Sequence, residues 1–229
     1  MSIEAFLSLL QFTDGLFPAG AYAHSFGLES YVQAGVVRDA TGVEAFLRAL
    51  LESSSGPTDA VVALCAWRAA RSDDLETCHQ IDRAFDAMKP AAELRSASRQ
   101  MGRQVLRIAS REAGHPLLEN LLRAVERGTS PGHHAVAFGA VGGVLGWGSE
   151  ETAGAYLYST SAAVVAAALR LLPIGQTASQ RILWSMQPAI GRLAREAEAK
   201  GLEDAWSFSP GLEIAAMRHA TLDARLFRS

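Results

Sequence analysis

Cysteine is scarce in this 229-residue sequence, which contains only Cys65 and Cys78. Both lie in segments with helical patterning and provide no disulfide framework, so we expect reduced thiols in a cytoplasmic protein. No Cys-x-x-Cys or His-Glu-x-x-His motif occurs, and the adjacent pair His133 and His134 would point about 100° apart on a helix. The sequence therefore establishes no metal site, and we expect each histidine at a helix end or on the surface.

A large excess of charge of one sign is also absent, since 21 basic and 24 acidic residues give a net charge of −3. We therefore expect no general attraction to nucleic acid or to an anionic membrane. Long apolar runs are missing as well: residues 135–147 are too few to span a bilayer, and Arg170 interrupts residues 162–172. With 49% hydrophobic residues, the chain can still bury a good-sized core.

Strand patterns are lacking too, because no run alternates between apolar and polar residues and no hairpin turn lies between two such runs. A helical period is present instead, and residues 43–51 show the apolar spacing of a core-facing stripe. Helix start and stop signals alternate along the whole chain. The pattern predicts an all-α, single-domain bundle over residues 1–229, with roughly ten helices joined by short links.

Local signals predict several helix ends and one close helix contact. Thr41 and Glu44 form a capping-box pattern that starts a helix. Residues 55–57 (Ser-Gly-Pro) predict a stop, and Pro188 predicts a kink or a split. The four glycines between 139 and 146 strip one helix face of side chains, so we expect another backbone to pack closely there.

The segment from Leu9 to Glu29 concentrates polar groups beside a stiff Phe-Pro-Ala-Gly turn. Four polar side chains follow the turn among aromatic residues: Tyr22, His24, Ser25 and Glu29. Such groups on a connecting segment suit a catalytic site or a docking surface. One alternative is a small helical hydrolase that uses His24, Ser25 and Glu29, because Ala-His-Ser-Phe-Gly approaches the nucleophile motif Gly-x-Ser-x-Gly, although no strand precedes it.

A basic ridge is expected on the helix that contains residues 93–112. Arginines recur there every four residues and share one slowly drifting face, because a helical turn takes about 3.6 residues. They are Arg95, Arg99, Arg103, Arg107 and Arg111. The ridge is either a solvated face with salt bridges to neighbours or a docking ridge for an acidic partner, and the sequence favours neither.

The last residues, 220–229, are more apolar than a chain end usually is. Leu226 and Phe227 lie between Arg225 and Arg228. Burying the two apolar side chains is worth about 3–6 kcal/mol before ordering costs. The tail either folds back on its own core or orders on a partner, and the flanking arginines favour the partner.

Together these motifs resemble the urease accessory protein UreF family. The resemblance rests on Phe-Pro-x-Gly and His-Ser-Phe-Gly-Leu-Glu in the opening segment, on residues 93–103, on Leu-Pro-Ile-Gly-Gln at 172–176 and on Arg-Leu-Phe-Arg-Ser at 225–229. It covers nearly the whole length. Gly15 departs from the family, which usually has serine at this position.

The resemblance implies an all-α, dimeric and non-catalytic protein that binds UreD (also called UreH) and then recruits the GTPase UreG. The complex would bring nickel to the urease apoprotein, so nickel and GTP would be handled by the partners and no cofactor would be held here. An alternative that keeps the same partner is a GTPase-activating protein that supplies an arginine.

The resemblance also implies roles for particular residues. The tail residues would order on UreD and help to form the surface that UreG meets: Arg225, Leu226, Phe227, Arg228 and Ser229. Tyr22, His24, Ser25 and Glu29 would belong to a partner-facing region. Tyr156 and Tyr158 would contribute to the dimer contact.

Overall fold

The computed structural model describes residues 1–219, 221–222 and 224–228, and these residues contain no β-strand. Their α-helices, in chain order, are α1 (Ile3–Thr13), α2 (Leu28–Gln33), α3 (Ala40–Leu50), α4 (Val61–Arg71), α5 (Leu75–Ala87), α6 (Ala92–Ala113), α7 (Pro116–Glu126), α8 (His134–Leu145), α9 (Ser149–Leu171), α10 (Gln176–Glu198) and α11 (Pro210–His219). Three other helical segments are η1 (Ala21–Ala23), η2 (Leu51–Ala60) and η3 (Leu202–Asp204). The predicted all-α class is confirmed.

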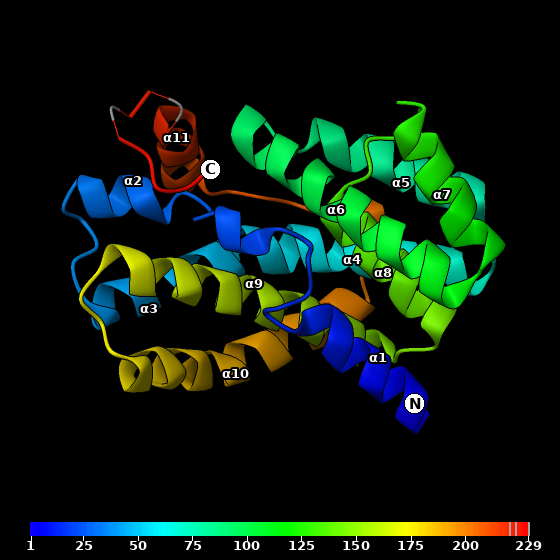
Figure 1. Cartoon of the computed structure of the whole chain (residues 1–229), viewed down its shortest axis with the longest axis horizontal. Coiled ribbons are helices and arrows are strands. Elements are labelled where there is room, and N and C mark those ends of the chain that lie inside the picture. The colour runs from blue at the N-terminus through cyan, green and yellow to red at the C-terminus, as the bar shows by residue number, and fades with distance from the viewer. Residues whose placement is uncertain (220, 223, 229) are drawn as a thin grey trace.

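Helix α9 runs through the middle of the molecule, and α10 packs along it (Figure 1). Helix α8 packs against both α4 and α6, while α7 packs against α6 and α5. Helix α11, near the C-terminus, packs beside the short helix α2. The N-terminus and α1 lie on the other side of the view (Figure 1). One apolar cluster extends from Ala5 to Phe227 and includes the predicted stripe over residues 43–51.

Glycines on α8 allow α4 to approach closely. A Cβ on Gly139 would collide with the backbone carbonyl oxygen of Ala63, and a Cβ on Gly143 would lie 2.5 Å from the carbonyl oxygen of Trp67. Backbone atoms inside a packed helix pair cannot move aside at low cost, so a side chain does not fit at these positions. The close backbone contact predicted for residues 139–146 is confirmed.

The stop predicted at residues 55–57 is wrong. Instead, η2 is a π-helix that joins α3 to α4 in one continuous helical run. Its wider turn accommodates Pro57, which has no N–H to donate. Two of its carbonyl groups accept hydrogen bonds from the segment after η3: Trp206 N donates to Pro57 O at 3.2 Å, and Phe208 N donates to Ser53 O at 3.0 Å. These distant partners explain why the local stop signal does not end the helix.

Two other local predictions need correction. Asp39, rather than Thr41, caps α3, because its carboxylate accepts a hydrogen bond from Gly42 N at 2.9 Å. Helix α10 continues through Pro188, so of the predicted kink or split the split is excluded. The buried side chains of Met186 and Ile190, on either side of the proline, hold this helix against the core.

Helix α9 is long and apolar enough to cross a membrane by length and composition alone, yet 56% of its most apolar window is buried inside the fold. It packs against α10 and α4. Its apolar composition is therefore explained by its place in the core.

The contact between α4 and α8 predicts that Gly139→Ala destabilises the fold by about 3 kcal/mol, because the added methyl group forces two helix backbones apart. Gly154→Ala in α9 is the matched control, since a Cβ there meets nothing within 4 Å. Alanine should stabilise that helix by up to about 1 kcal/mol. Urea unfolding of both variants measures the difference, and equal stabilities would contradict the packing described here.

Candidate functional site

The turn between α1 and α2 is fixed by backbone conformations that favour glycine. Gly20 and Gly27 have φ angles of +87° and +88°. Residues other than glycine rarely adopt such backbone angles. Ser25 then supports the start of α2, because its Oγ accepts a hydrogen bond from Glu29 N at 3.3 Å. The turn therefore places Glu29 in the first turn of α2, next to α11.

Glu29 is a buried carboxylate that binds the end of the chain. Only 2% of the residue is exposed. Its Oε1 accepts a hydrogen bond from Leu226 N at 2.7 Å, and its Oε2 accepts one from Phe227 N at 3.1 Å. Oε2 also lies 2.9 Å from Nε2 of His219. One side chain of α2 thus holds both the tail backbone and the last residue of α11.

His219 connects Glu29 to a second carboxylate on α6. Its Nδ1 lies 2.8 Å from Oε2 of Glu93, and the other oxygen of Glu93 accepts from Nη1 of Arg225 at 3.1 Å. The imidazole is completely buried. We call Glu29, Glu93, His219 and Arg225 the C-terminal clasp. It joins α2, α6, α11 and the tail, and hydrogen bonds that involve ionised groups are among the stronger ones.

The aromatic ring of Phe227 anchors the tail in the apolar core. The residue is 4% exposed, and the guanidinium of Arg170 lies 4.3 Å from the ring centroid. Arg170 also donates from Nη1 to the carbonyl oxygen of Tyr22 at 2.9 Å, and Arg228 N donates to Ala23 O at 2.8 Å. Burying the ring contributes about 2–3 kcal/mol. The tail is therefore bound to the opening turn as well as to α6.

The hydrogen bonds to Glu29 keep it ionised. Burial alone would raise the pKa of this carboxyl, but donation from Leu226 N, His219 and Phe227 N outweighs burial and lowers the pKa below its usual value. A carboxyl whose pKa is lowered in the folded state stabilises the fold above the unfolded value of 4.5 and loses that contribution as the pH falls below it. The contribution of Glu29 to the clasp is therefore lost in acid.

The structure corrects the expectation that the apolar tail residues wait for a partner. Phe227 packs into the core of its own chain, because Glu29 satisfies the adjacent backbone amides and Arg170 covers the ring. Leu226 remains 52% exposed. Arg225 and Arg228 are exposed residues on the same segment. Ser229 lies outside the described residues.

The four polar residues of the opening segment differ sharply in exposure. Tyr22 is 71% exposed, whereas His24, Ser25 and Glu29 are nearly or completely buried. Of the four, only Tyr22 presents its side chain to solvent in this structure, so it is the one that a partner can meet without a rearrangement of the turn. Burial of Ser25 also removes the support for the hydrolase alternative, because a substrate cannot reach its Oγ without opening the turn.

The two tyrosines expected at a dimer contact lie in different environments. Tyr156 is 4% exposed, and its hydroxyl donates to Oδ2 of Asp59 at 3.3 Å, so the side chain is part of the core. Burial and the neighbouring Asp59 carboxylate raise the pKa of Tyr156 well above its ordinary value. Tyr158 is 40% exposed. Only Tyr158 is therefore placed where a second copy could contact it.

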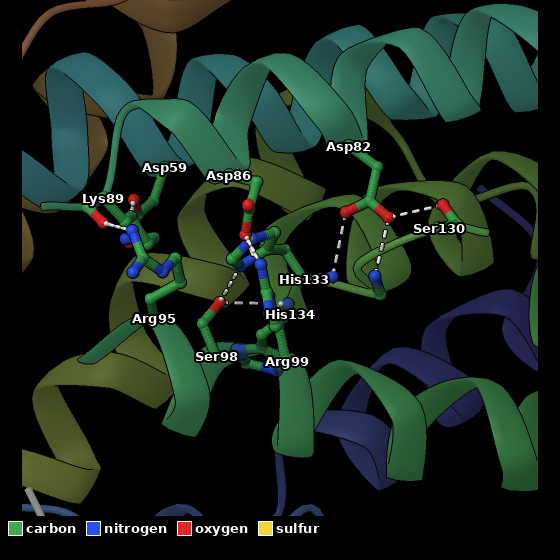
Figure 2. A network of polar contacts seen from close by, with 11 residues as sticks. Asp59, Asp82, Asp86, Lys89, Arg95, Ser98, Arg99, Ser130, His133 and His134 are labelled. Carbon is green, nitrogen blue, oxygen red and sulfur yellow. Dashed lines mark hydrogen bonds and ion pairs between the residues drawn. The ribbon is translucent and has the colours of Figure 1, made fainter. Parts of the chain in front are cut away.

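A second polar network joins α5, α6 and the start of α8 (Figure 2). The buried carboxylate of Asp82 accepts hydrogen bonds from Ser130 Oγ, Gly132 N and His133 N at 2.6–2.9 Å. His133 lies between Asp86 and Ser98, with its ring nitrogens 2.8 and 3.0 Å from their oxygens. His133 caps α8 but is fully buried, so it lies at a helix end as predicted and not on the surface.

Neither network forms a metal site. Glu29 and Glu93 lie at opposite nitrogens of the His219 ring, so their oxygens do not converge on one point. Across the described part of the chain, no group of three or more His, Cys, Asp or Glu residues is arranged to hold a metal ion. Cys65 and Cys78 are free thiols, and burial raises the pKa of Cys78 to about 12.

Sequence reasoning missed three residues of the site: Glu93, Arg170 and His219. Glu93 and His219 are 126 residues apart, and Arg170 is 148 residues from Tyr22. No local pattern links such positions. The only available signal was the unusual tail itself, whose polar backbone requires partners once its apolar residues are buried.

Comparison with known proteins gives a consistent result over the whole chain. A family model described as UreF matches residues 37–187. A urease accessory protein UreF from Bacillus sp. (strain TB-90) is 33% identical over 97% of this chain and 98% of its own length. The protein of the same description from Paenarthrobacter aurescens (strain TC1) is 33% identical over the full length of both chains. That from Streptococcus salivarius (strain 57.I) is 29% identical over 100% of this chain and 97% of its own.

The clasp predicts that Glu29→Gln releases the tail while the helices stay folded. Hydrogen bonds to a charged acceptor contribute about 1.5–3 kcal/mol, so the amides of Leu226 and Phe227 should exchange about 10–100 times faster. Hydrogen–deuterium exchange measures this, with Glu44→Gln, which changes an exposed glutamate paired with Arg48, as the control. Unchanged exchange in Glu29→Gln would contradict the clasp.

The buried histidines predict a loss of stability in mild acid. Burial, with the charge of Arg228, lowers the pKa of His24 to about 4, and burial lowers that of His134 to about 4 from 6.5. The unfolded chain then binds more protons, so the free energy of unfolding should fall as the pH drops from about 6.5 to 4.5. Urea unfolding across this range checks the slope. His134→Gln should flatten it, and an unchanged slope would contradict the assignment.

Proposed function

The chain belongs to the UreF family of urease accessory proteins, and from this premise we propose that it is a non-catalytic scaffold in urease maturation. It binds a UreD-type protein (also called UreH) and then the GTPase UreG, and the assembly delivers nickel to the urease apoprotein. It works in the cytoplasm as a homodimer of one domain per chain, with Tyr158 at the contact between copies.

The joined chain ends support this proposal most directly. Tyr22 is 71% and Leu226 52% exposed, on two segments that Arg170 and the clasp bind together. Exposed tyrosine and leucine beside Arg225 and Arg228 have the composition of a protein interface, in which aromatic residues and arginine are enriched. Because Arg170 and the backbone of Arg228 bind the opening turn to the tail, one partner surface can contact both segments. UreD is the partner assigned to this surface.

GTP and nickel are assigned to the partners. The sequence has no Gly-x-x-x-x-Gly-Lys-Ser/Thr loop, which is the usual cradle for nucleotide phosphates in a GTPase. A scaffold can nevertheless control a GTPase by binding its two nucleotide states with different affinity. In this proposal the nickel ion is cargo that partner proteins carry.

We predict that removing either exposed part of the surface weakens UreD binding. Tyr22→Ala, or a chain that ends at Ala224, should reduce affinity for UreD at least about tenfold, because an exposed aromatic anchor typically contributes more than 1.4 kcal/mol. Trp184→Ala is the matched control, since Trp184 is 73% exposed on α10. Biolayer interferometry with purified UreD measures the change. Full affinity in the shortened chain would overturn the assignment of the tail.

The same preparation distinguishes the scaffold from a GTPase-activating protein. Single-turnover GTP hydrolysis by UreG is measured with UreD, with and without this chain. A scaffold leaves the chemical step unchanged. Strong acceleration of hydrolysis by this chain, lost in an arginine-to-alanine variant, would reject the scaffold hypothesis and support a GTPase-activating protein.

A further inference from the structure

A basic groove lies between α5, α6 and the segment that joins α7 to α8; it shares α6 with the clasp but includes none of the four clasp residues. Its volume is about 790 Å³. Arg83, Arg99, Arg103 and Arg107 line it from α5 and α6, and residues 125 and 128–131 contribute the other side. No aspartate or glutamate among the described residues belongs to the lining. In a chain with a net charge of −3, such a concentration of positive charge needs an explanation.

The arginines differ in how far their charge is compensated. Arg99 donates from Nε to Oδ1 of Asp86 at 2.9 Å, as Figure 2 shows, and Arg83 pairs with Glu76 at 3.1 Å. Among the described residues, no carboxylate lies within 4.0 Å of the guanidinium groups of Arg103 or Arg107. Arg107 instead donates to the amide oxygen of a neighbouring glutamine on α6 at 3.3 Å. The middle of the groove therefore carries two uncompensated positive charges.

Both sides of the groove are fixed in place. Asp82 accepts hydrogen bonds from Ser130, Gly132 and His133, which ties residues 130–133 to α5 (Figure 2). A Cβ on Gly102 would collide with the backbone carbonyl of Gly132, so α6 lies directly against the same segment. A rigid groove loses little conformational entropy when a ligand binds. The site is thus preorganised.

The spacing of the arginines indicates the shape of the ligand. Arg99, Arg103 and Arg107 are four residues apart on α6, which corresponds to a rise of about 6 Å per step along the helix. Carboxylates four residues apart on another α-helix have the same repeat, so the two rows of charge can pair along their length. Nucleic acid is disfavoured, because its binding requires a positive field that the net charge of −3 does not supply.

We propose that this groove, defined by Arg83, Arg99, Arg103, Arg107 and residues 125 and 128–131, binds an acidic α-helix of a partner protein. The helix carries aspartate or glutamate at every fourth position and lies along α6. The inference does not depend on the proposed function of the chain ends. Of the two interpretations of the arginine ridge that the sequence leaves open, the proposal takes the docking ridge, while Arg99 makes a salt bridge as the other interpretation expects.

The probe, called the spaced peptide, is a fluorescein-labelled, alanine-based helical peptide with four glutamates spaced four residues apart. The control peptide has the same composition, but its glutamates are distributed around the helix. Fluorescence anisotropy with the full-length protein at low salt gives the dissociation constants. The spaced peptide should bind at least about fivefold more tightly than the control, because only its charges match the repeat of α6. Equal binding of the two peptides, or no binding of the spaced one, would overturn the proposal.

Variants locate the binding to the groove. Arg103→Glu should weaken binding of the spaced peptide at least about tenfold. Arg103→Lys keeps the positive charge and should retain most of the affinity. Arg181→Glu on α10 is the matched control, since Arg181 is also exposed and its substitution changes the net charge equally. If Arg103→Glu does not fold, Arg103→Gln takes its place. Equal weakening by the two glutamate variants, or displacement of the peptide by an RNA oligonucleotide of higher affinity, would reject an acidic helix as the ligand.

Discussion

The buried carboxylate of Glu29 is the acceptor on which the placement of the C-terminal tail against the opening turn depends. It binds two tail amides and His219 at 2.7–3.1 Å. Without Glu29, the buried amide of Phe227 would have no partner, at a cost of about 1–3 kcal/mol. Satisfaction of this amide allows Phe227 to enter the core and leaves Tyr22 and Leu226 exposed on adjoining segments. An ion buried for structural reasons thus determines which side chains a partner can meet.

The rest of the fold provides rigid supports for this site and for the basic groove. Glycines 139 and 143 bring α8 against α4, and the π-helix η2 continues α3 into α4. The carboxylate of Asp82 holds the loop before α8. Close packing and satisfied backbone groups make such a framework stiff. Stiff supports suit a scaffold, because a surface that is already ordered loses little entropy on binding.

The sequence predicts those features that depend on neighbouring residues. The helical period gives the all-α class, and the glycines between 139 and 146 give the close helix contact. The stop at residues 55–57 fails because Trp206 and Phe208 satisfy carbonyl groups that a local pattern treats as free. The clasp cannot be read from the sequence, since its members come together only after the intervening helices have packed. Solvent exposure also depends on tertiary packing. The motif alone therefore does not reveal that Ser25 is buried and Tyr22 is exposed.

Our central claim is that the turn between α1 and α2 and the C-terminal tail together form the surface that binds UreD. The most direct test is an experimental structure of this chain bound to its UreD-type partner. We predict that the side chains of Tyr22 and Leu226 both contact UreD, with Phe227 still packed in its own core. A complex in which Tyr22 and Leu226 both face solvent while UreD binds elsewhere would contradict the claim.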